Sequence, residues 1–303
     1  MGPNRTLTGR LVERHAFRSG TTPGVEVRIG ISGWTYEPWR GSFYPPGLAH
    51  RRELAYVAER MNSVEINSSF YSLQRPSSYT AWAAAVPDDF VFAVKGGRFL
   101  THLKKLAEID TPLANFYASG VLALGTRLGP FLWQLPPNLG FDVARLEGFF
   151  ERLPRTAGAA AAIAAGHDQR IPTDRALTET AEPDRPLRHA IEVRHESFRS
   201  AAFYDLLRRR DVALVVADNP GKWPIIEELT TDFMYVRLHG HDVLYASGYD
   251  DESLDAWAAR IRAWTAAGQD VYVYCDNDIK VRAPYDAIAL AERLGVGPGR
   301  AQV

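Results

Sequence analysis

The chain contains eight short apolar runs, and segments with helical periodicity separate most of them. The runs have the length of strands and are rich in β-branched and aromatic residues, as buried parallel strands are. They are Val27–Ser32, Ser63–Asn67, Phe90–Lys95, Phe131–Leu135, Ala190–Arg194, Ala213–Asp218, Phe233–His239 and Asp270–Asp276. Strands that alternate with helices predict a parallel sheet, and eight such units predict closure into a single (β/α)₈ barrel.

Ser253–Ala266 is the clearest helical segment, because Leu254, Trp257, Ile261 and Trp264 recur at helical spacing and form one apolar stripe. A doubly wound open sheet is the alternative fold. It would require a glycine-rich turn after the first strand to bind a dinucleotide, and that turn is absent from the sequence. The other segments with helical character are Arg51–Met61, Ser77–Ala84, Ala201–Arg210 and Tyr285–Leu294.

A length of 303 residues lies within the range of single α/β barrels. We expect residues 25–297 to form the barrel. Residues 1–24 are rich in Arg and Thr and lack the apolar region of a signal peptide, so we expect a flexible, disordered N-terminal arm. Residues 155–188, after the fourth strand, interrupt the alternation of strands and helices with an Ala-rich segment followed by a polar, Pro-containing segment. We interpret them as a surface insertion, with a lid over the site as the alternative.

The overall charge excludes some classes of partner. Thirty-five basic and 36 acidic residues leave a formal net charge of −1, so no global field attracts nucleic acid or an anionic membrane. Cys275 is the only cysteine, which excludes an intrachain disulfide and a Cys-based zinc motif and fits a reducing cytosol. No apolar run approaches the roughly 20 residues that span a bilayer. We expect a cytoplasmic protein without a membrane partner.

Charged side chains are expected inside the barrel. Side chains alternate between the two faces of a strand, so in Phe233–His239 the residues Tyr235, Arg237 and His239 share one face. The apolar face must contact the helices, and the polar face therefore points inward. These groups gather at the carboxyl ends of the runs, where barrel enzymes place their active sites. They are Glu65, Asn67, Lys95, Gln134, Glu192, Arg194, Asp218, Arg237, His239 and Asp276.

A charge buried without a partner costs several kcal/mol, so the cluster requires an explanation. A closed network of ion pairs is one, since the carboxylates and cations nearly balance. We favour a ligand pocket, because apolar side chains would fill the barrel at least as stably. Lys95, Arg194 and Arg237 are predicted to hold an anion, such as a phosphate or a carboxylate. Arg237→Met is accordingly expected to abolish binding of a phosphate ester and to leave the fold intact.

The candidate catalytic residues are Glu65, Glu192, Asp218 and His239. The two glutamates are predicted to act as base, and His239 is predicted to shuttle a proton. A divalent metal held by the carboxylates with His195 and His239 is the alternative, although no dense metal-binding motif occurs. The substrate-binding candidates are Asn67, Lys95, Gln134, Arg194, His195, Arg237, Asp276, Asn277, Trp34 and Tyr36.

The segment of residues 32–45, after the first run, is unusually rich in aromatic side chains. We predict a stacking wall for a sugar ring or a base, with packing of a long loop as the alternative. Phe70 and Tyr71 follow the second run and extend this wall. The aromatic residues of the segment are Trp34, Tyr36, Trp39, Phe43 and Tyr44.

Eight motifs together resemble the YecE-like proteins, a domain of unknown function (DUF 72). They are Ile29–Pro45, Ser63–Gln74, Phe92–Leu106, Trp133–Pro137, Ile191–Phe198, Ala217–Gly221, Tyr235–Gly240 and Tyr272–Lys280. The resemblance covers Val27 to about Leu294 and implies a TIM barrel without an established activity. Members commonly carry an aromatic residue at the position of Cys275, which argues against a catalytic thiol. The nearest functional analogy, to metal-dependent phosphodiesterase barrels such as the endonuclease IV group, is one of fold alone.

Three functional hypotheses follow from the sequence. The first is a hydrolase-type enzyme, similar to a phosphodiesterase, that acts on a phosphorylated or sugar-like substrate. The second is a non-catalytic module that binds a small anionic metabolite. The third is a DNA-binding repair barrel, which needs a basic rim and would lose affinity steeply with salt. Arg98, His102, Lys104 and Lys105 form the one segment that offers such a rim.

Overall fold

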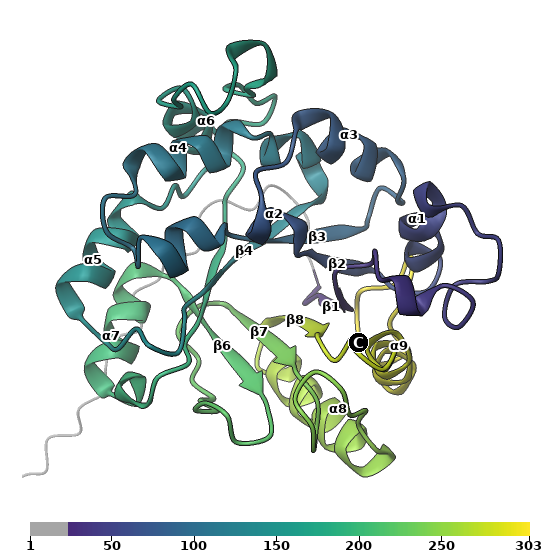
Figure 1. Ribbon diagram of the computed structural model, residues 1–303. Coiled ribbons are helices and arrows are strands. Elements are labelled where there is room, and N and C mark those ends of the chain that lie inside the picture. Colours follow the sequence, from purple (N-terminus) through teal and green to yellow (C-terminus); the bar gives the residue numbers. More distant parts are fainter. Residues whose placement is uncertain (1–23) are drawn as a thin grey trace, which may run out of the picture.

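The computed structural model describes residues 24–303, so the predicted N-terminal arm lies outside the described residues except for Gly24. Eight parallel strands pair in sequence order, and the last strand closes on the first, which makes a complete barrel (Figure 1). The prediction of a (β/α)₈ barrel is therefore confirmed. The strands are β1 (Val27–Ser32), β2 (Ser63–Ile66), β3 (Val91–Lys95), β4 (Leu128–Gln134), β5 (His189–Glu192), β6 (Ala213–Asp218), β7 (Phe233–Leu238) and β8 (Asp270–Cys275).

Strand β4 is the one whose start differs most from the predicted run. It begins at Leu128, where its pairing with Phe92 of β3 begins, three residues before the run that starts at Phe131. Gly129 and Pro130 are poor strand formers, so the sequence does not predict this extension of the strand. A Cβ at Gly129 would lie 2.5 Å from the Val91 side chain, so the close approach of β3 requires glycine there.

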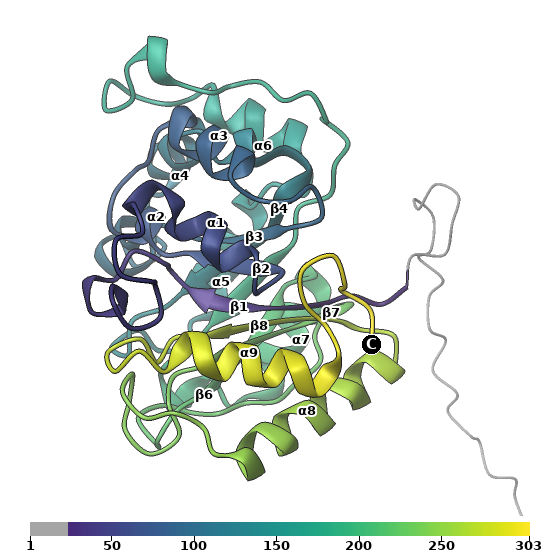
Figure 2. The same cartoon turned by 90° about the vertical axis from the view of Figure 1, so that its right-hand side faces the viewer.

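Helices surround the barrel (Figures 1 and 2). No helix follows β6 within the described residues. Residues 219–232 connect β6 directly to β7, which differs from the eight strand–helix units expected. None of the helices in residues 24–303 is both long enough and apolar enough to cross a membrane. They are α1 (Glu53–Ala58), α2 (Ser68–Tyr71), α3 (Pro76–Ala84), α4 (Asp110–Ala118), α5 (Val143–Arg152), α6 (Ala157–Ala164), α7 (Ala201–Arg210), α8 (Asp251–Ala266) and α9 (Ala283–Leu294), with a π-helical turn at Phe99–Leu103.

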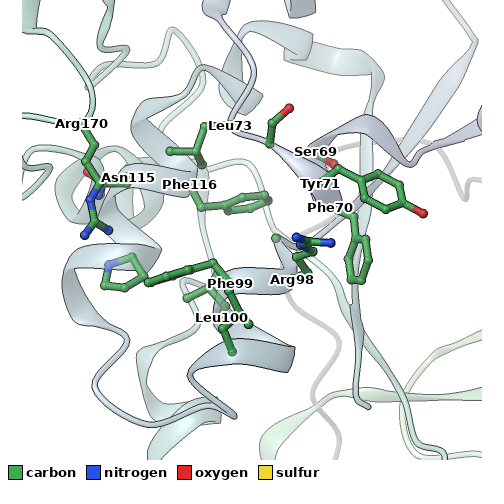
Figure 3. A pocket seen from close by; sticks show the side chains of 14 residues that line it. Ser69, Phe70, Tyr71, Leu73, Arg98, Phe99, Leu100, Asn115, Phe116 and Arg170 are labelled. Atoms are coloured by element: carbon green, nitrogen blue, oxygen red, sulfur yellow. The ribbon is translucent and has the colours of Figure 1, made fainter. Parts of the chain in front are cut away.

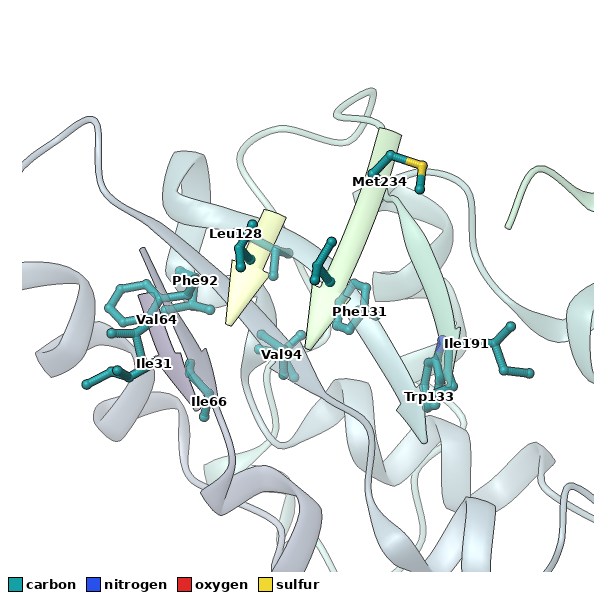
Figure 4. Close-up of a cluster of buried hydrophobic side chains, with 14 of the residues drawn as sticks. Ile31, Val64, Ile66, Phe92, Val94, Leu128, Phe131, Trp133, Ile191 and Met234 are labelled. Atoms are coloured by element: carbon teal, nitrogen blue, oxygen red, sulfur yellow. The ribbon is translucent and has the colours of Figure 1, made fainter. Parts of the chain in front are cut away.

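Two apolar clusters hold the barrel together. The larger lies between the outer faces of the strands and the helices, and Val64, Phe92 and Trp133 are fully buried in it (Figure 4). The smaller lies inside the barrel, where Tyr235, Tyr272 and Tyr274 project from β7 and β8. Space for these rings comes from alanines at several inward positions of the other strands. These small residues are Ala93, Ala190, Ala213 and Ala217.

Two further segments cover the barrel from outside. In residues 155–188, α6 lies outside α4 (Figure 1), and the Asn115 amide donates to Asp168 Oδ1 at 3.0 Å. At the amino end of the barrel, the backbone N–H of Val27 donates to the carbonyl of Ala301 at 2.6 Å. The carboxyl end of the chain therefore lies beside the start of β1 (Figure 2), past the boundary predicted at residue 297.

Candidate functional site

Arg237, on β7, lies at the centre of a buried charged cluster at the carboxyl ends of the strands. Its Nε donates to Glu65 Oε2 at 3.1 Å, and its Nη2 donates to Glu65 Oε1 at 2.9 Å. Its Nη1 donates to Glu192 Oε2 at 2.7 Å, and Nη2 lies 3.1 Å from Asp276 Oδ2. Carboxylates from β2, β5 and the end of β8 thus converge on one guanidinium. This corrects the expectation that Arg237 holds the anion of a ligand, because its donors already face protein acceptors.

Opposite charges keep the members of the cluster ionised. Burial would raise the pKa of Glu192, but Arg194 and Arg237 hold that pKa well below its ordinary value. Burial acts in the same direction on Asp276, and Arg237 and His239 hold its pKa below the usual range. Burial would lower the pKa of Arg237, and the surrounding carboxylates raise it well above its ordinary value. Glu192, Asp276 and Arg237 are therefore all charged at neutral pH.

Ser32 and Tyr235 complete the environment of Glu65. The Ser32 hydroxyl donates to Oε1, and the Tyr235 hydroxyl donates to Oε2 at 2.7 Å. Together with Arg237 they occupy both carboxylate oxygens, so Glu65 is placed to orient Arg237 rather than to take a proton from a substrate. Neither Ser32 nor Tyr235 was predicted from the sequence to be a site residue. The sequence did contain a signal for Tyr235, because it shares the inward face of β7 with Arg237 and His239.

His239 is the residue of the cluster whose second ring nitrogen has no hydrogen-bond partner in the described part of the chain. Its Nδ1 lies 2.9 Å from Asp276 Oδ2, and its buried Nε2 has no hydrogen-bond partner among residues 24–303. Nε2 lies 3.8 Å from Glu192 Oε2. The Trp223 and Tyr245 rings each pack against the imidazole at a centroid distance of 5.5 Å. A carboxylate on one nitrogen fixes the ring and leaves the other nitrogen available for acid–base chemistry.

Arg194 is the first of two cations that face the mouth of the barrel. Its Nε and Nη2 contact the same oxygen of Glu192, Oε1, at 2.7 and 2.6 Å. Its guanidinium lies over the Trp223 ring, 4.0 Å from the centroid. Nη1 of Arg194 makes no hydrogen bond within the described part of the chain, so this edge can bind a ligand oxygen.

Lys95, at the end of β3, is the second cation. Its Nζ lies 4.5 Å from the centre of the Phe70 ring and makes neither a hydrogen bond nor an ion pair with any residue from 24 to 303. Burial and the nearby Arg237 lower the pKa of Lys95 to about 8. Burial, Arg194 and Lys95 also lower the pKa of His102 to about 4, so this imidazole is neutral at pH 7. From the sequence, His102 was predicted only to be part of a basic rim.

A cavity of about 630 Å³ adjoins the cluster on the side of β1 and β2. Three predicted ligand-binding residues, Trp34, Tyr36 and Asn67, line it together with Trp82 and Tyr71. The Asn67 amide nitrogen donates to the carbonyl and the hydroxyl of Ser32 at 3.1 and 2.8 Å. Its Oδ1 is buried and has no partner among the described residues, which leaves one acceptor for a ligand.

The other predicted members take different positions. The inward Gln134, on β4, is buried near the cluster. Asp218 was predicted to face inward, and this was wrong: Ala213, Val215 and Ala217 are the inward residues of β6. Asp218 therefore points outward, where the Trp257 indole donates to its Oδ2 at 3.3 Å.

Asn277 and His195 also lie apart from the charged cluster. The Asn277 amide donates to Asp286 Oδ2 at 2.6 Å, on the helix-facing side, because Asp276 takes the inward position. His195 is exposed and contacts Ser197 at 2.9 Å. The metal-ligand set that included Asp218 and His195 is therefore not assembled, and residues 24–303 hold no group of three His, Cys, Asp or Glu side chains suited to a metal.

Loop residues supply part of the site that strand alternation does not predict. Trp223 reaches Arg194 and His239 from the connection between β6 and β7, and Tyr245 reaches His239 from the loop after β7. The indole nitrogen of Trp223 is also buried without a partner among the described residues. The sequence contained no periodic signal for either residue, because loop geometry places them.

The closed barrel and its charged mouth define a TIM-barrel protein whose candidate ligand site lies at the carboxyl ends of the strands. The sequence model of one family, described as "Protein of unknown function DUF72", matches residues 28–302. The chain belongs to this family, which confirms the resemblance seen in the motifs.

Relatives of known sequence and structure agree with this assignment. UPF0759 protein YunF of Bacillus subtilis (strain 168) is 23% identical over 281 residues, which cover 83% of this chain and 89% of YunF. UPF0759 protein YecE of Escherichia coli (strain K12) is 27% identical over 129 residues, 42% of this chain and 44% of YecE. The crystal structure of a DUF72 family protein from Thermotoga maritima MSB8 has a TM-score of 0.71 at 24% identity and covers 89% of this chain and 99% of its own. This likeness shows the shared fold.

Proposed function

We propose that the chain is a hydrolase-type enzyme that acts on a small phosphorylated or sugar-like substrate at the mouth of the barrel. One observation carries the proposal: His239 has a carboxylate on Nδ1 at 2.9 Å and a buried Nε2 without a partner among residues 24–303. An imidazole held in this way takes a proton from an attacking water and returns it later in the reaction. The large majority of buried side-chain polar atoms have a hydrogen-bond partner, so this nitrogen requires an explanation.

Lys95 and Arg194 hold the anionic group of the substrate in this proposal. Both are largely buried, and both keep donors that no described protein group accepts. Glu192 anchors Arg194 through Oε1 and Arg237 through Oε2, so the guanidinium groups are held in place before the ligand arrives. The cavity beside Trp34 and Asn67 then receives the ring that carries the anion.

For a phosphate ester as substrate, the proposed chemical step is hydrolysis. Nε2 of His239 accepts a proton from water while the water oxygen bonds to phosphorus. The bond from phosphorus to the ester oxygen breaks, and the departing alkoxide takes up the proton that Nε2 of His239 has gained. Lys95, with a pKa of about 8, is largely protonated at pH 7 and offsets the negative charge on the phosphoryl oxygens.

The test is turnover of a panel of sugar phosphates by the full chain, followed as release of inorganic phosphate. For a substrate found in this way, His239→Gln should lower kcat by about 10²–10⁴-fold, because it removes the acid–base group. Lys95→Met should weaken the binding of inorganic phosphate in calorimetry. His195→Gln is the matched control, since this exposed histidine lies outside the cluster. A rate that His239→Gln leaves unchanged would refute the assignment.

The second candidate is a binding module for a small anionic metabolite. The observation that favours it is the closed pairing of Arg237 with Glu65, Glu192 and Asp276, which is also suited to rigid recognition without chemistry. It is distinguished by thermal stabilisation of the chain by sugar phosphates without any release of phosphate. A nucleic-acid partner has weaker support, because Lys104 of the basic segment is paired with Glu108 at 2.9 Å.

A further inference from the structure

A second cavity, of about 300 Å³, lies outside the barrel between α2, the π-helical turn and α4 (Figure 3). Its walls are mainly apolar, with Phe70, Leu100 and Phe116 among the buried side chains that form them. This volume is at the lower end of the range of ligand pockets and is sufficient for one aromatic ring with a short substituent. Phe70 and Tyr71, which were predicted to extend the aromatic wall, line it, and Tyr71 also lines the 630 Å³ cavity.

A group of exposed apolar side chains lies around this cavity. Eleven large apolar residues are exposed among those described, and four of them line it. Leu103 and Tyr71 are the most exposed, at 64% and 67%. Scattered exposed apolar residues need no explanation, but a group of them around a concave surface marks a binding site. The four residues are Tyr71, Leu73, Phe99 and Leu103.

The backbone of the same wall is irregular. Phe99–Leu103 form a π-helical turn, a conformation that is rare and is often found at functional sites. It is followed by Lys105, Leu106 and Glu108, which have left-handed φ angles of 47°, 67° and 50°. Such conformations are costly for residues other than glycine and are retained at ligand sites more often than elsewhere.

A cation stands at the edge of the apolar walls. Figure 3 shows the Arg98 guanidinium between Phe116 and the pair Phe70–Tyr71. Arg98 makes no side-chain hydrogen bond or ion pair with the residues that the structure describes. Arg170 also lines the cavity, where its guanidinium lies 5.5 Å from the centre of the Phe99 ring. An apolar pocket with a free guanidinium suits a ligand that has both a ring and a negative charge.

We propose that this cavity binds a small aromatic carboxylate, with its ring among Phe70, Phe99 and Phe116 and its carboxylate on Arg98. Phenylalanine rings favour an aromatic occupant through edge-to-face contacts. The site is separate from the proposed catalytic cluster, but Phe70 is common to both, because its ring also lies 4.5 Å from Lys95 Nζ. An occupant of the cavity therefore borders the wall of the barrel mouth.

The experiment is a ¹⁹F NMR titration of the full chain with 4-fluorophenylacetate. We expect 4-fluorophenylacetate to bind saturably. Uncharged 4-fluorobenzyl alcohol should bind more weakly, and so should acetate, whose binding is followed by competition with the fluorinated probe. Arg98→Gln should weaken the binding of 4-fluorophenylacetate by about tenfold, since it removes a charge-assisted hydrogen bond. Leu103→Glu should weaken it by at least as much, because it places a negative charge at the rim.

Matched variants separate this site from the rest of the surface. Ile279→Glu is the control for Leu103→Glu, because Ile279 is similarly exposed, at 61%, and lies outside the cavity. Arg75→Gln is the control for Arg98→Gln, because it removes an exposed cation that does not line the cavity. Both variants should bind the probe as the unmodified chain does. His239→Gln should also bind normally, so failure of the proposed hydrolase function leaves this result unaffected. The proposal is overturned if the probe does not bind, if acetate binds as tightly, or if neither Arg98→Gln nor Leu103→Glu weakens binding.

Discussion

Nδ1 of His239 lies 2.9 Å from Oδ2 of Asp276, and this contact joins the residue that follows β7 to the residue that follows β8. The same oxygen of Asp276 lies 3.1 Å from Nη2 of Arg237. One carboxylate atom therefore links the imidazole to the guanidinium that also holds Glu65 and Glu192. The acid–base group and the ion-pair network are parts of one structure.

Asp276→Asn should destabilise the protein by about 2 kcal/mol at pH 7, because charged partners lose a carboxylate. Burial opposes the ionisation of Asp276, but Arg237 and His239 hold its pKa below the usual range. Its contribution to stability is thus complete above the unfolded pKa of about 3.9 and is lost as the pH falls through the lower folded value. Urea unfolding at a series of pH values should show the two proteins converging below about pH 4. A constant difference down to pH 2 would contradict this account.

Arg237→Met should lower the free energy of unfolding by about 3–5 kcal/mol, since it leaves buried carboxylates without their common partner. This differs from the expectation, drawn from the sequence, that the fold would be unaffected. Arg199→Met is the control: its pair with Glu196 is exposed, and such pairs contribute about 0–1 kcal/mol. Equal effects of the two substitutions in urea unfolding would show that the buried network is not structural.

Lys95→Met should stabilise the protein at pH 7, by about 2 kcal/mol. The pKa of Lys95 is about 8, lowered first by burial and then by Arg237. A charged Lys95 is therefore unfavourable in the folded state. This penalty is complete below pH 8 and disappears as the pH rises toward the ordinary value of about 10.4. Thermal unfolding at pH 7 and pH 10 measures it, and a variant that is less stable at pH 7 would refute the prediction.

Asp218→Asn should leave the binding of inorganic phosphate unchanged, because Asp218 points away from the charged cluster. It should cost about 1 kcal/mol of stability through the weakened contact with the Trp257 indole. Calorimetry with phosphate and urea unfolding measure the two effects separately. Loss of phosphate binding without loss of stability would contradict this prediction and show that Asp218 belongs to the ligand site.

Strand alternation predicted much of the charged cluster correctly. Arg237, Glu192 and Glu65 face inward, because the apolar residues that alternate with them along the strands pack against the helices. Asp218 was predicted to face inward because it lies at the end of a run. The alternation along the strand places it on the outward face, since Ala217 and not Asp218 is in phase with the inward Ala213. The pattern was present in the sequence, but alanine carries no strong signal of either face.

The sequence by itself determined the eight strands, their parallel order and the end of the barrel at which the charges gather. Those properties follow from local periodicity and from the chirality of strand–helix units. Only the tertiary structure decided that carboxylates enclose Arg237, whereas Lys95 and Arg194 keep donors that no residue from 24 to 303 accepts. It also decided that Trp223 and Tyr245 reach His239 from loops. Pairing among inward charges depends on distances between strands far apart in the chain, and no local pattern encodes those distances.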